Sequence, residues 1–202
     1  MMMGKRIFDF LAALFLLLVL SPLILVLFFL IWSRRQGPVL FRQTRTGQYG
    51  RPFTLLKFRT MTDERDSIGR LLPDEERFTR LGRWMRQNSL DELPQLFCIL
   101  AGKMSLVGPR PLLPEYLPLY SAAQNRRHEV LPGITGLAQA KGRNSLRWED
   151  KFRFDTWYVN HRTFILDLWI LFLTIRPLIR QEHIYPSDSR SVIPFRGNKQ
   201  SA

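Results

Sequence analysis

The sequence predicts an α+β protein that is mainly helical, with an N-terminal re-entrant membrane helix-break-helix, a small β-hairpin and interfacial amphipathic helices. Three patterns predict this class. An uncharged apolar run at 10–32 is interrupted at its middle by Ser21-Pro22, two β-rich runs follow it, and helical periodicity begins at Leu81. We expect three regions, which are a re-entrant membrane segment at 1–35, a globular domain at 36–183 and a disordered tail at 184–202.

The composition separates one apolar segment from an ordinary globular remainder. The chain has 202 residues, with 30 lysines and arginines against 17 aspartates and glutamates, and therefore a formal charge of +13. Residues 10–32 hold 21 apolar positions in 23 and no charge. One cysteine and three histidines exclude a disulfide framework and a Cys/His zinc module within this chain. The remaining length suits one domain with its own core.

The apolar segment is long enough to cross a bilayer, but two features favour a hairpin within it. Pro22 removes a backbone donor at the midpoint and Ser21 offers its hydroxyl to a freed carbonyl, which predicts a sharp bend. Basic residues flank both ends, so the positive-inside rule finds no outside face. A straight single-pass helix is the alternative, because proline occurs in membrane helices. A signal peptide is excluded, because the run is too long and no small-residue cleavage site precedes Trp32.

The segment after Pro38 is expected to form a hairpin and then a loop. Residues 39–45 and 52–60 are rich in β-forming side chains and are joined by a turn with two glycines. Residues 62–80 are charged and are interrupted by glycine and proline, which favours a mobile loop over a helix of any length.

Helical patterns occupy most of the later chain. Apolar residues recur at helical spacing on two short helices, a strand-like stretch follows at 104–108, and a loop is expected around Pro132-Gly133. Two longer helices are predicted at 148–161 and 163–180. The uncharged apolar run of the last helix is too short to span a membrane. It is therefore expected to lie in the membrane interface, with Trp169 as an anchor, or to close the core.

Asp91 and Glu92 stand side by side at the predicted start of a helix. Ser89 and Glu92 match the spacing of a capping box, while Pro94 makes Asp91 the alternative cap. Both patterns permit a purely structural role, since the helix dipole favours carboxylates there. In the functional interpretation the helix start keeps both carboxylates ionised, so that one is a nucleophile or both bind a divalent cation.

Four basic residues are candidates for contact with an anionic ligand. Arg110 lies between two prolines that fix its backbone, which can aim a guanidinium at a phosphate, although an ordinary loop arginine fits equally well. Lys57 and Arg59 are two apart on a predicted strand and share one face, where lysines are mostly solvated. Arg86 taken alone is an ordinary surface residue of a helix.

Asp155 lies in an aromatic and basic stretch, where a salt bridge to Arg153 or Arg162 is the structural alternative to ligand binding. P-loop, Rossmann and zincin motifs do not occur in the sequence, which argues against those classes. Paired acids and several arginines in a membrane-embedded protein suit an anionic substrate that carries phosphate. A non-catalytic adaptor that binds anionic lipid or nucleic acid is the competing class, because +13 alone permits it.

A set of motifs occurs in the order seen in bacterial sugar transferases. These are Lys5-Arg6-Ile7-Phe8-Asp9, Ser21-Pro22, Gly37-Pro38-Val39-Leu40-Phe41-Arg42-Gln43, Lys57-Phe58-Arg59-Thr60-Met61, Ser89-Leu90-Asp91-Glu92-Leu93-Pro94-Gln95, Met104-Ser105-Leu106-Val107-Gly108-Pro109-Arg110-Pro111 and Pro132-Gly133-Ile134-Thr135-Gly136. From about Lys5 to Arg180 the chain resembles the small monotopic phosphoglycosyl transferases, the polyprenyl-phosphate hexose-1-phosphate transferase family. One departure is Lys103, where relatives usually carry an acid.

The resemblance implies an activity, which is transfer of a sugar 1-phosphate from a UDP-sugar to polyprenyl phosphate, such as undecaprenyl phosphate, with release of UMP. Asp91 would attack the phosphorus next to the sugar and form a covalent aspartyl-phosphosugar intermediate. The polyprenyl phosphate would then displace it, which predicts ping-pong kinetics. The reaction would be the first membrane step of glycoconjugate biosynthesis.

The resemblance also implies a cofactor and the residues of the site. Asp91 and Glu92 are the expected catalytic residues, and they are also the expected ligands of Mg²⁺, the family cofactor. The expected substrate-binding residues are Lys57, Arg59, Arg86, Arg110 and Asp155, of which all but Arg59 match positions that line the family's site. The family fold contains a re-entrant helix bent at the Ser-Pro pair, here Ser21-Pro22.

The resemblance further implies where the protein works and what it meets. The region 36–183 would be a catalytic domain on the cytoplasmic face of the bacterial inner membrane. The expected partners are a UDP-sugar, polyprenyl phosphate and membrane lipid, without nucleic acid, and homodimer formation stays open. The donor sugar is not named by the sequence, although the stretch 142–149 resembles members that act on N-acetylated, bacillosamine-type donors.

Overall fold

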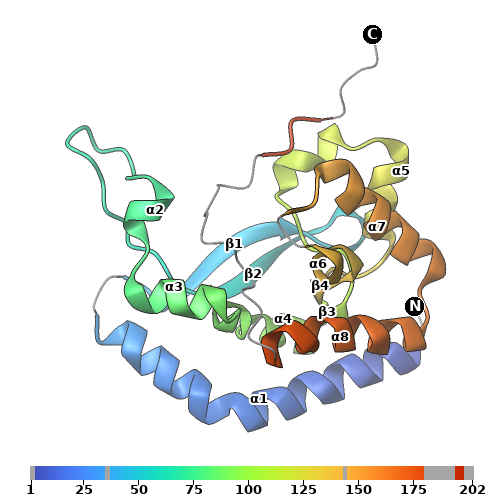
Figure 1. Cartoon of the computed structure of the whole chain (residues 1–202), viewed down its shortest axis with the longest axis horizontal. Helices are drawn as coiled ribbons and strands as arrows, with labels where there is room; N and C mark the ends of the chain where they lie inside the picture. The colour runs from blue at the N-terminus through green and yellow to red at the C-terminus, as the bar shows by residue number, and fades with distance from the viewer. Residues whose placement is uncertain (1–2, 35–36, 143–144, 180–193, 198–202) are drawn as a thin grey trace.

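The computed structural model is mainly helical and holds two small sheets, which confirms the predicted α+β class (Figure 1). It describes residues 3–34, 37–142, 145–179 and 194–197. Helix α1 (Met3–Trp32) runs along one side of the molecule with helix α8 (Phe164–Ile179) next to it. The strands and the other helices form a body on the same side of α1 as α8, in which α4 packs directly on α1.

Helix α1 continues through Pro22, so the predicted helix break is wrong, but the helix is bent near its middle (Figure 1). Pro22 cannot donate to the carbonyl of Leu18, four residues earlier. The Ser21 hydroxyl donates to that carbonyl instead, at 2.7 Å. This bond replaces the backbone hydrogen bond that Pro22 cannot make, so the helix bends at this point without ending.

Both arms of the bent helix pack on the body, and the outer face of α1 stays uncovered. Ala13 of the first arm and Leu27 of the second belong to two separate clusters of buried apolar residues. Within the described residues α1 alone is long and apolar enough to cross a membrane, and only 17% of its most apolar stretch is buried. The large exposed side chains of this face include Phe10, Leu11, Phe15, Leu18, Val19, Leu25, Val26 and Phe29. An uncovered apolar surface of this kind indicates membrane association.

The predicted hairpin is present as strands β1 (Leu40–Thr46) and β2 (Pro52–Phe58), which pair antiparallel across a 3₁₀ turn, η1 (Gln48–Gly50). The charged segment 62–79 that follows contains one short helix, α2 (Asp74–Arg77), and projects away from the body (Figure 1). Regular structure resumes at α3 (Arg80–Gln87), where the Thr79 hydroxyl accepts the Gly82 amide at 2.8 Å and caps the helix.

A second, parallel sheet joins β3 (Ser105–Val107) to β4 (Gly133–Thr135), so the loop expected around Pro132-Gly133 is in fact a strand. The two strands approach closely at two glycines. A Cβ on Gly133 would lie 2.1 Å from the Gly108 nitrogen, and one on Gly108 would lie 2.3 Å from the Leu131 oxygen. Only glycine fits at both positions. The sequence did not predict strand β4, because three residues are too few to show an alternating pattern.

Short helices fill the chain around this sheet. They are α4 (Gln95–Leu100), η3 (Pro114–Leu119), α5 (Ala122–Asn125), η4 (Arg126–Glu129) and α6 (Leu137–Lys141). The two longer predicted helices are confirmed as α7 (Trp148–His161) and α8. Helix α8 closes the core, as one of the two alternatives predicted, because Ile170 is fully buried there. Trp169 and Phe172 of the same helix are exposed, and their place in the membrane interface stays a prediction.

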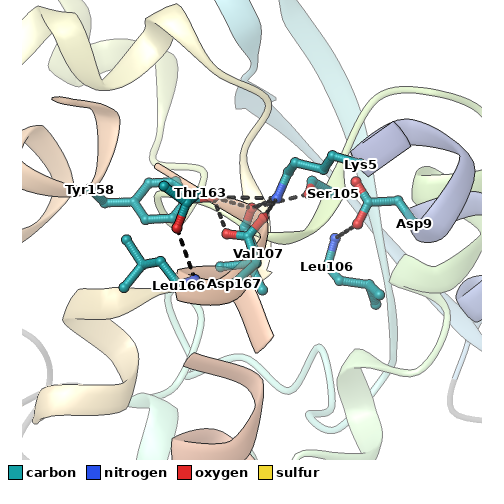
Figure 2. A network of polar contacts seen from close by, with 9 residues as sticks. All are labelled: Lys5, Asp9, Ser105, Leu106, Val107, Tyr158, Thr163, Leu166 and Asp167. Carbon is teal, nitrogen blue, oxygen red and sulfur yellow. Dashed lines mark hydrogen bonds and ion pairs between the residues drawn. The ribbon is translucent and has the colours of Figure 1, made fainter. Parts of the chain in front are cut away.

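The first turns of α1 are bound to β3 through polar side chains (Figure 2). The Asp9 carboxylate accepts the Leu106 amide at 3.1 Å, although this carboxylate lies in a largely apolar helix. The Arg6 guanidinium donates to the carbonyls of Met104, at 3.1 Å, and Ile99, at 2.9 Å. These bonds fix α1 to the segment that leads into Pro109-Arg110.

Lys5 lies at the centre of the same network and connects three more elements (Figure 2). Its ammonium forms an ion pair with Asp167 of α8 and donates to the Val107 carbonyl at 3.1 Å. The Tyr158 hydroxyl of α7 donates to Asp167 at 2.6 Å. Burial, and then the adjacent Asp167, raise the pKa of Tyr158, so the phenol keeps the proton that it donates.

Most of the predicted disordered tail, at 184–193 and 198–202, lies outside the described residues. The described part, 194–197, packs on the body, and the ring of Phe195 is buried there. Phe195 contacts four aromatic rings at centroid distances of 4.9 to 5.8 Å, those of Tyr116, Tyr120, Trp148 and Phe152. The polar composition of the tail gave no sign of this single anchor.

Replacing Lys5 with methionine is expected to lower the free energy of unfolding by about 3 kcal/mol, because a buried carboxylate loses its cationic partner. Methionine keeps the apolar stem, so the change isolates the charge. Urea titration in detergent micelles measures the effect. Lys103→Met is the matched control, since Lys103 is exposed in the turn after α4; equal stability losses in both variants would contradict the role given to Lys5.

Candidate functional site

Asp91 and Glu92 lie in a 3₁₀ turn, η2 (Leu90–Glu92), between α3 and α4. Ser89 enters the turn in the left-handed region, with φ of 57°, and its side chain makes no capping bond to any described residue. The predicted capping box is therefore wrong, and Asp91 does not cap α4 either, because the residue before that helix is Pro94. The carboxylates are placed by the turn and by cations from other elements.

Glu92 is held by two cations. Its Oε1 accepts from Lys57 Nζ of β2 at 2.6 Å and from Arg110 Nη2 at 3.0 Å. Burial alone would raise the pKa of Glu92, but Arg110 and then Lys57 outweigh it and lower the pKa to about 2. Glu92 is therefore a permanent anion that organises the cations around it.

Asp91 differs from its neighbour in both contacts and acidity. Only 4% of its surface is exposed, and its Oδ2 lies 3.8 Å from Lys57 Nζ, too far for a direct hydrogen bond. Burial raises the pKa of Asp91, Lys57 opposes that rise, and the adjacent Glu92 charge adds to it. A carboxylate with a raised pKa is a better nucleophile. The 3.8 Å separation from Lys57 also leaves the Asp91 carboxylate freer to move than a short ion pair would.

Arg86 completes a group of three cations around the two acids. It occupies the last turn of α3, with its guanidinium 4.9 Å from the centre of the Phe78 ring. Its charge, together with those of Lys57 and Arg110, favours the ionised form of Asp91. The structure thus brings together five of the seven predicted catalytic and substrate-binding residues.

The other two predicted residues bind elsewhere. Arg59 follows β2 and pairs with Asp63, at 2.6 Å, and not with Asp91 or Glu92. Asp155 is buried on α7 and pairs with Arg127 at 2.7 Å. The sequence predicted Arg153 or Arg162 as the salt-bridge partner of Asp155. The partner in the structure is Arg127, 28 residues earlier.

Arg45 is a neighbour of the site that sequence reasoning missed. Burial lowers the pKa of Arg45, and the nearby charge of Arg110 lowers it further. Its buried Nε has no hydrogen-bond partner among the described residues. Strand register is the signal that could have identified it, because Arg45 lies four residues after Phe41, the partner of Lys57, on the same face of the hairpin.

The acids fit a Mg²⁺ ion that shares its coordination with a substrate. Mg²⁺ prefers carboxylate oxygens and substrate phosphates and keeps several waters, so one or two protein carboxylates suffice. Asp91 and Glu92 would supply them. Within the described ranges no group of three or more histidine, cysteine, aspartate or glutamate side chains could form an all-protein site. The donor set therefore suits a metal bound jointly with phosphate oxygens.

Comparison with known proteins identifies the family of the chain. The family model for bacterial sugar transferases matches residues 1–181. The chain belongs to the bacterial sugar transferase family. As a member of the family it is a transferase enzyme, which excludes the non-catalytic adaptor as the main role of the chain.

Three relatives show how the family members differ in length and in the function that their names give. The uncharacterized sugar transferase EpsL of Bacillus subtilis is 54% identical over 98% of both chains. The undecaprenyl-phosphate galactose phosphotransferase of Salmonella typhimurium is 36% identical over 90% of this chain and 41% of its own length. The UDP-glucose:undecaprenyl-phosphate glucose-1-phosphate transferase of Klebsiella pneumoniae is 38% identical over 86% of this chain and 40% of its own. This sugar transferase thus spans about two fifths of the length of the Salmonella and Klebsiella proteins.

Glu92→Gln is expected to lower the free energy of unfolding at pH 7, by up to about 3 kcal/mol, when measured in EDTA. The pKa of Glu92 is 4.5 in the unfolded chain and about 2 in the folded one, so its contribution is present above pH 4.5 and is lost as pH falls toward 2. The difference in free energy of unfolding between variant and wild type should therefore disappear as the pH falls over that range. Glu115→Gln is the control, because Glu115 is exposed. A gap that stays constant below pH 4.5 would argue against the ionic role of Glu92.

Proposed function

We propose that this sugar transferase moves a sugar 1-phosphate from a UDP-sugar to a polyprenyl phosphate, such as undecaprenyl phosphate, and releases UMP. The observation that carries the proposal is the pair of unlike acids, in which Glu92 is bound by two cations while Asp91 is buried without a short ion pair. The names of the galactose and glucose phosphotransferases among its relatives support the same acceptor.

Asp91 is the nucleophile of the first step. One of its carboxylate oxygens forms a bond to the phosphorus next to the sugar, and the bond from this phosphorus to the bridging oxygen breaks. UMP leaves with that oxygen and the electron pair, and an aspartyl-phosphosugar remains. Lys57, Arg86 and Arg110 hold the phosphate oxygens and reduce the charge repulsion between carboxylate and diphosphate.

The polyprenyl phosphate completes the transfer in a second step. Its phosphate oxygen bonds to the same phosphorus, the bond to Asp91 breaks, and the free carboxylate returns as the polyprenyl diphosphate sugar departs. Asp91 is the nucleophile toward the UDP-sugar and the leaving group toward the polyprenyl phosphate, so the two substrates react in turn and the kinetics are ping-pong. Mg²⁺, held by Asp91 and Glu92 with the diphosphate, would neutralise phosphate charge when bound. The reaction would start the assembly of a glycoconjugate.

The bent helix α1 enters and leaves the bilayer from one side, and the body lies on the cytoplasmic face of the inner membrane. The support is that both arms of α1 pack on the same body, while the exposed apolar face continues from α1 onto α8. A straight span would separate its two ends by the thickness of the membrane and could not keep both on one body. Lys141, 5.4 Å from the ring of Trp169, fits the level of the lipid headgroups.

The activity is tested with purified protein, Mg²⁺, undecaprenyl phosphate and a panel of UDP-sugars, with UMP release as the measurement. Asp91→Asn is expected to lower the rate by at least about 1,000-fold, because asparagine cannot form the covalent intermediate. Asp74→Asn is the matched control, since its side chain is exposed on α2. Without acceptor, the wild type should gain the mass of one sugar phosphate on Asp91. Full activity of Asp91→Asn, or a modified residue other than Asp91, would contradict the assignment.

The membrane topology is tested by labelling single introduced cysteines with a membrane-impermeant thiol reagent. Gly4→Cys and Ser33→Cys mark the two ends of α1, and a side chain at residue 4 meets nothing within 4 Å. Ala123→Cys marks the body, and the native Cys98 is buried. All three cysteines should react in inverted membrane vesicles and none in intact cells. Labelling of one end of α1 from each side would establish a straight span instead.

A further inference from the structure

Arg127 is a buried cation that lies outside the group around the acids. Only 3% of its surface is exposed. Its guanidinium donates to the Asp155 carboxylate from Nε, at 3.1 Å, and from Nη2, at 2.7 Å. The same Nη2 donates to the main-chain oxygen of Arg110 at 2.8 Å. One planar group thus joins α7 to the backbone of Arg110, whose side chain reaches Glu92.

The surroundings keep this guanidinium dry and in one orientation. The rings of Tyr120 and Phe152 lie 5.8 and 5.7 Å from it, and Phe195 of the tail packs on both rings. A buried ion pair is weak evidence for a stabilising role, because removing both charges from water costs more than most pairs return. What this pair does provide is a fixed donor for the Arg110 carbonyl.

The backbone at Arg110 has little freedom apart from that carbonyl. Pro109 and Pro111 have φ fixed by their rings. The Pro109 carbonyl accepts the Gly133 amide at 3.0 Å, where β4 meets the end of β3. With the Arg110 carbonyl held by Arg127, the direction in which the Arg110 side chain leaves the chain is set. That side chain reaches Glu92 at 3.0 Å.

We propose that Arg127 is a positioning residue for the transfer reaction, which orients the Arg110 guanidinium through the Arg110 main-chain oxygen. Asp155 acts by holding Arg127 and does not contact the substrate. The inference rests on the proposed function, because Arg110 is taken to bind phosphate. It adds a residue absent from the predicted site and gives Asp155 a different task from the one that the sequence suggested.

The test is a double-mutant cycle that joins Arg127→Lys with Arg110→Ala, with kcat and KM for the UDP-sugar as readouts. Lysine keeps the charge but lacks the planar fork, so it cannot bind Asp155 and the Arg110 carbonyl together. Arg127→Lys alone should lower kcat/KM by about 10- to 100-fold, the cost of a small misplacement of a binding group. In the Arg110→Ala background the same change should cost less than about 2-fold. Losses that multiply would overturn the proposal.

Two further variants keep the test decisive. Arg126→Lys changes the neighbouring, exposed arginine, which pairs with Glu129, and should leave kcat/KM unchanged in both backgrounds. Asp155→Asn keeps the shape of the side chain and should repeat the pattern of Arg127→Lys, so it replaces that variant if the lysine protein does not fold. A merely structural role predicts the same fractional loss with and without Arg110, after correction for the folded fraction by thermal unfolding.

The two levels of the proposal fail in different ways. If the wild type releases no UMP from any UDP-sugar, the proposed function fails and the role of Arg127 fails with it. If the wild type is active and Asp91→Asn is inactive, the function stands. Multiplicative losses in the cycle would then remove only the role of Arg127.

Discussion

The catalytic body depends on its attachment to a membrane helix through charged side chains. Lys5, Arg6 and Asp9 bind main-chain groups at and next to β3, much as a neighbouring strand would. Strand β3 consists of three residues with one partner strand, and a two-stranded pair is at best marginal in water. Because β3 leads directly into Pro109-Arg110, the position of the Arg110 guanidinium is tied to the position of α1. Membrane attachment and active-site geometry are therefore one structural problem.

Two neighbouring acids acquire opposite properties from the same few cations. Glu92 receives two direct bonds and a low pKa, whereas Asp91 receives burial, a raised pKa and only looser charge contacts. A lysine or arginine hydrogen-bonded directly to Asp91 would lower the pKa of that carboxylate and occupy an oxygen needed for attack on phosphorus. Lys57 and Arg110 form their short hydrogen bonds with Glu92. They act on Asp91 only through longer-range electrostatic attraction. The pair works as one unit because its members are unlike.

Local patterns predicted much of the fold, and long-range partners account for what they missed. Period and turn residues located the hairpin, α7 and α8, because those signals lie within about 15 neighbouring residues. The partners of Asp155 and of Lys5, 28 and 162 residues away, leave no trace in spacing. In the sequence Lys5 is one of the basic residues that flank the apolar segment, and in the structure it binds Asp167 and the Val107 carbonyl. Motif resemblance found the acids and three cations, but the direction of the Arg59 side chain depends on Asp63.

The contact between Lys5 and Asp167 also sets an order of events during synthesis. The two residues are 162 positions apart, so at about 5 to 20 residues per second the ribosome needs roughly 8 to 32 s to supply the partner of Lys5. Helix α1 is complete long before the β3 segment and α8 emerge. During that interval its charged first turns have only water and headgroups to solvate them. The nascent chain can therefore form the Lys5–Asp167 ion pair only after the first turn of α8 has been synthesised.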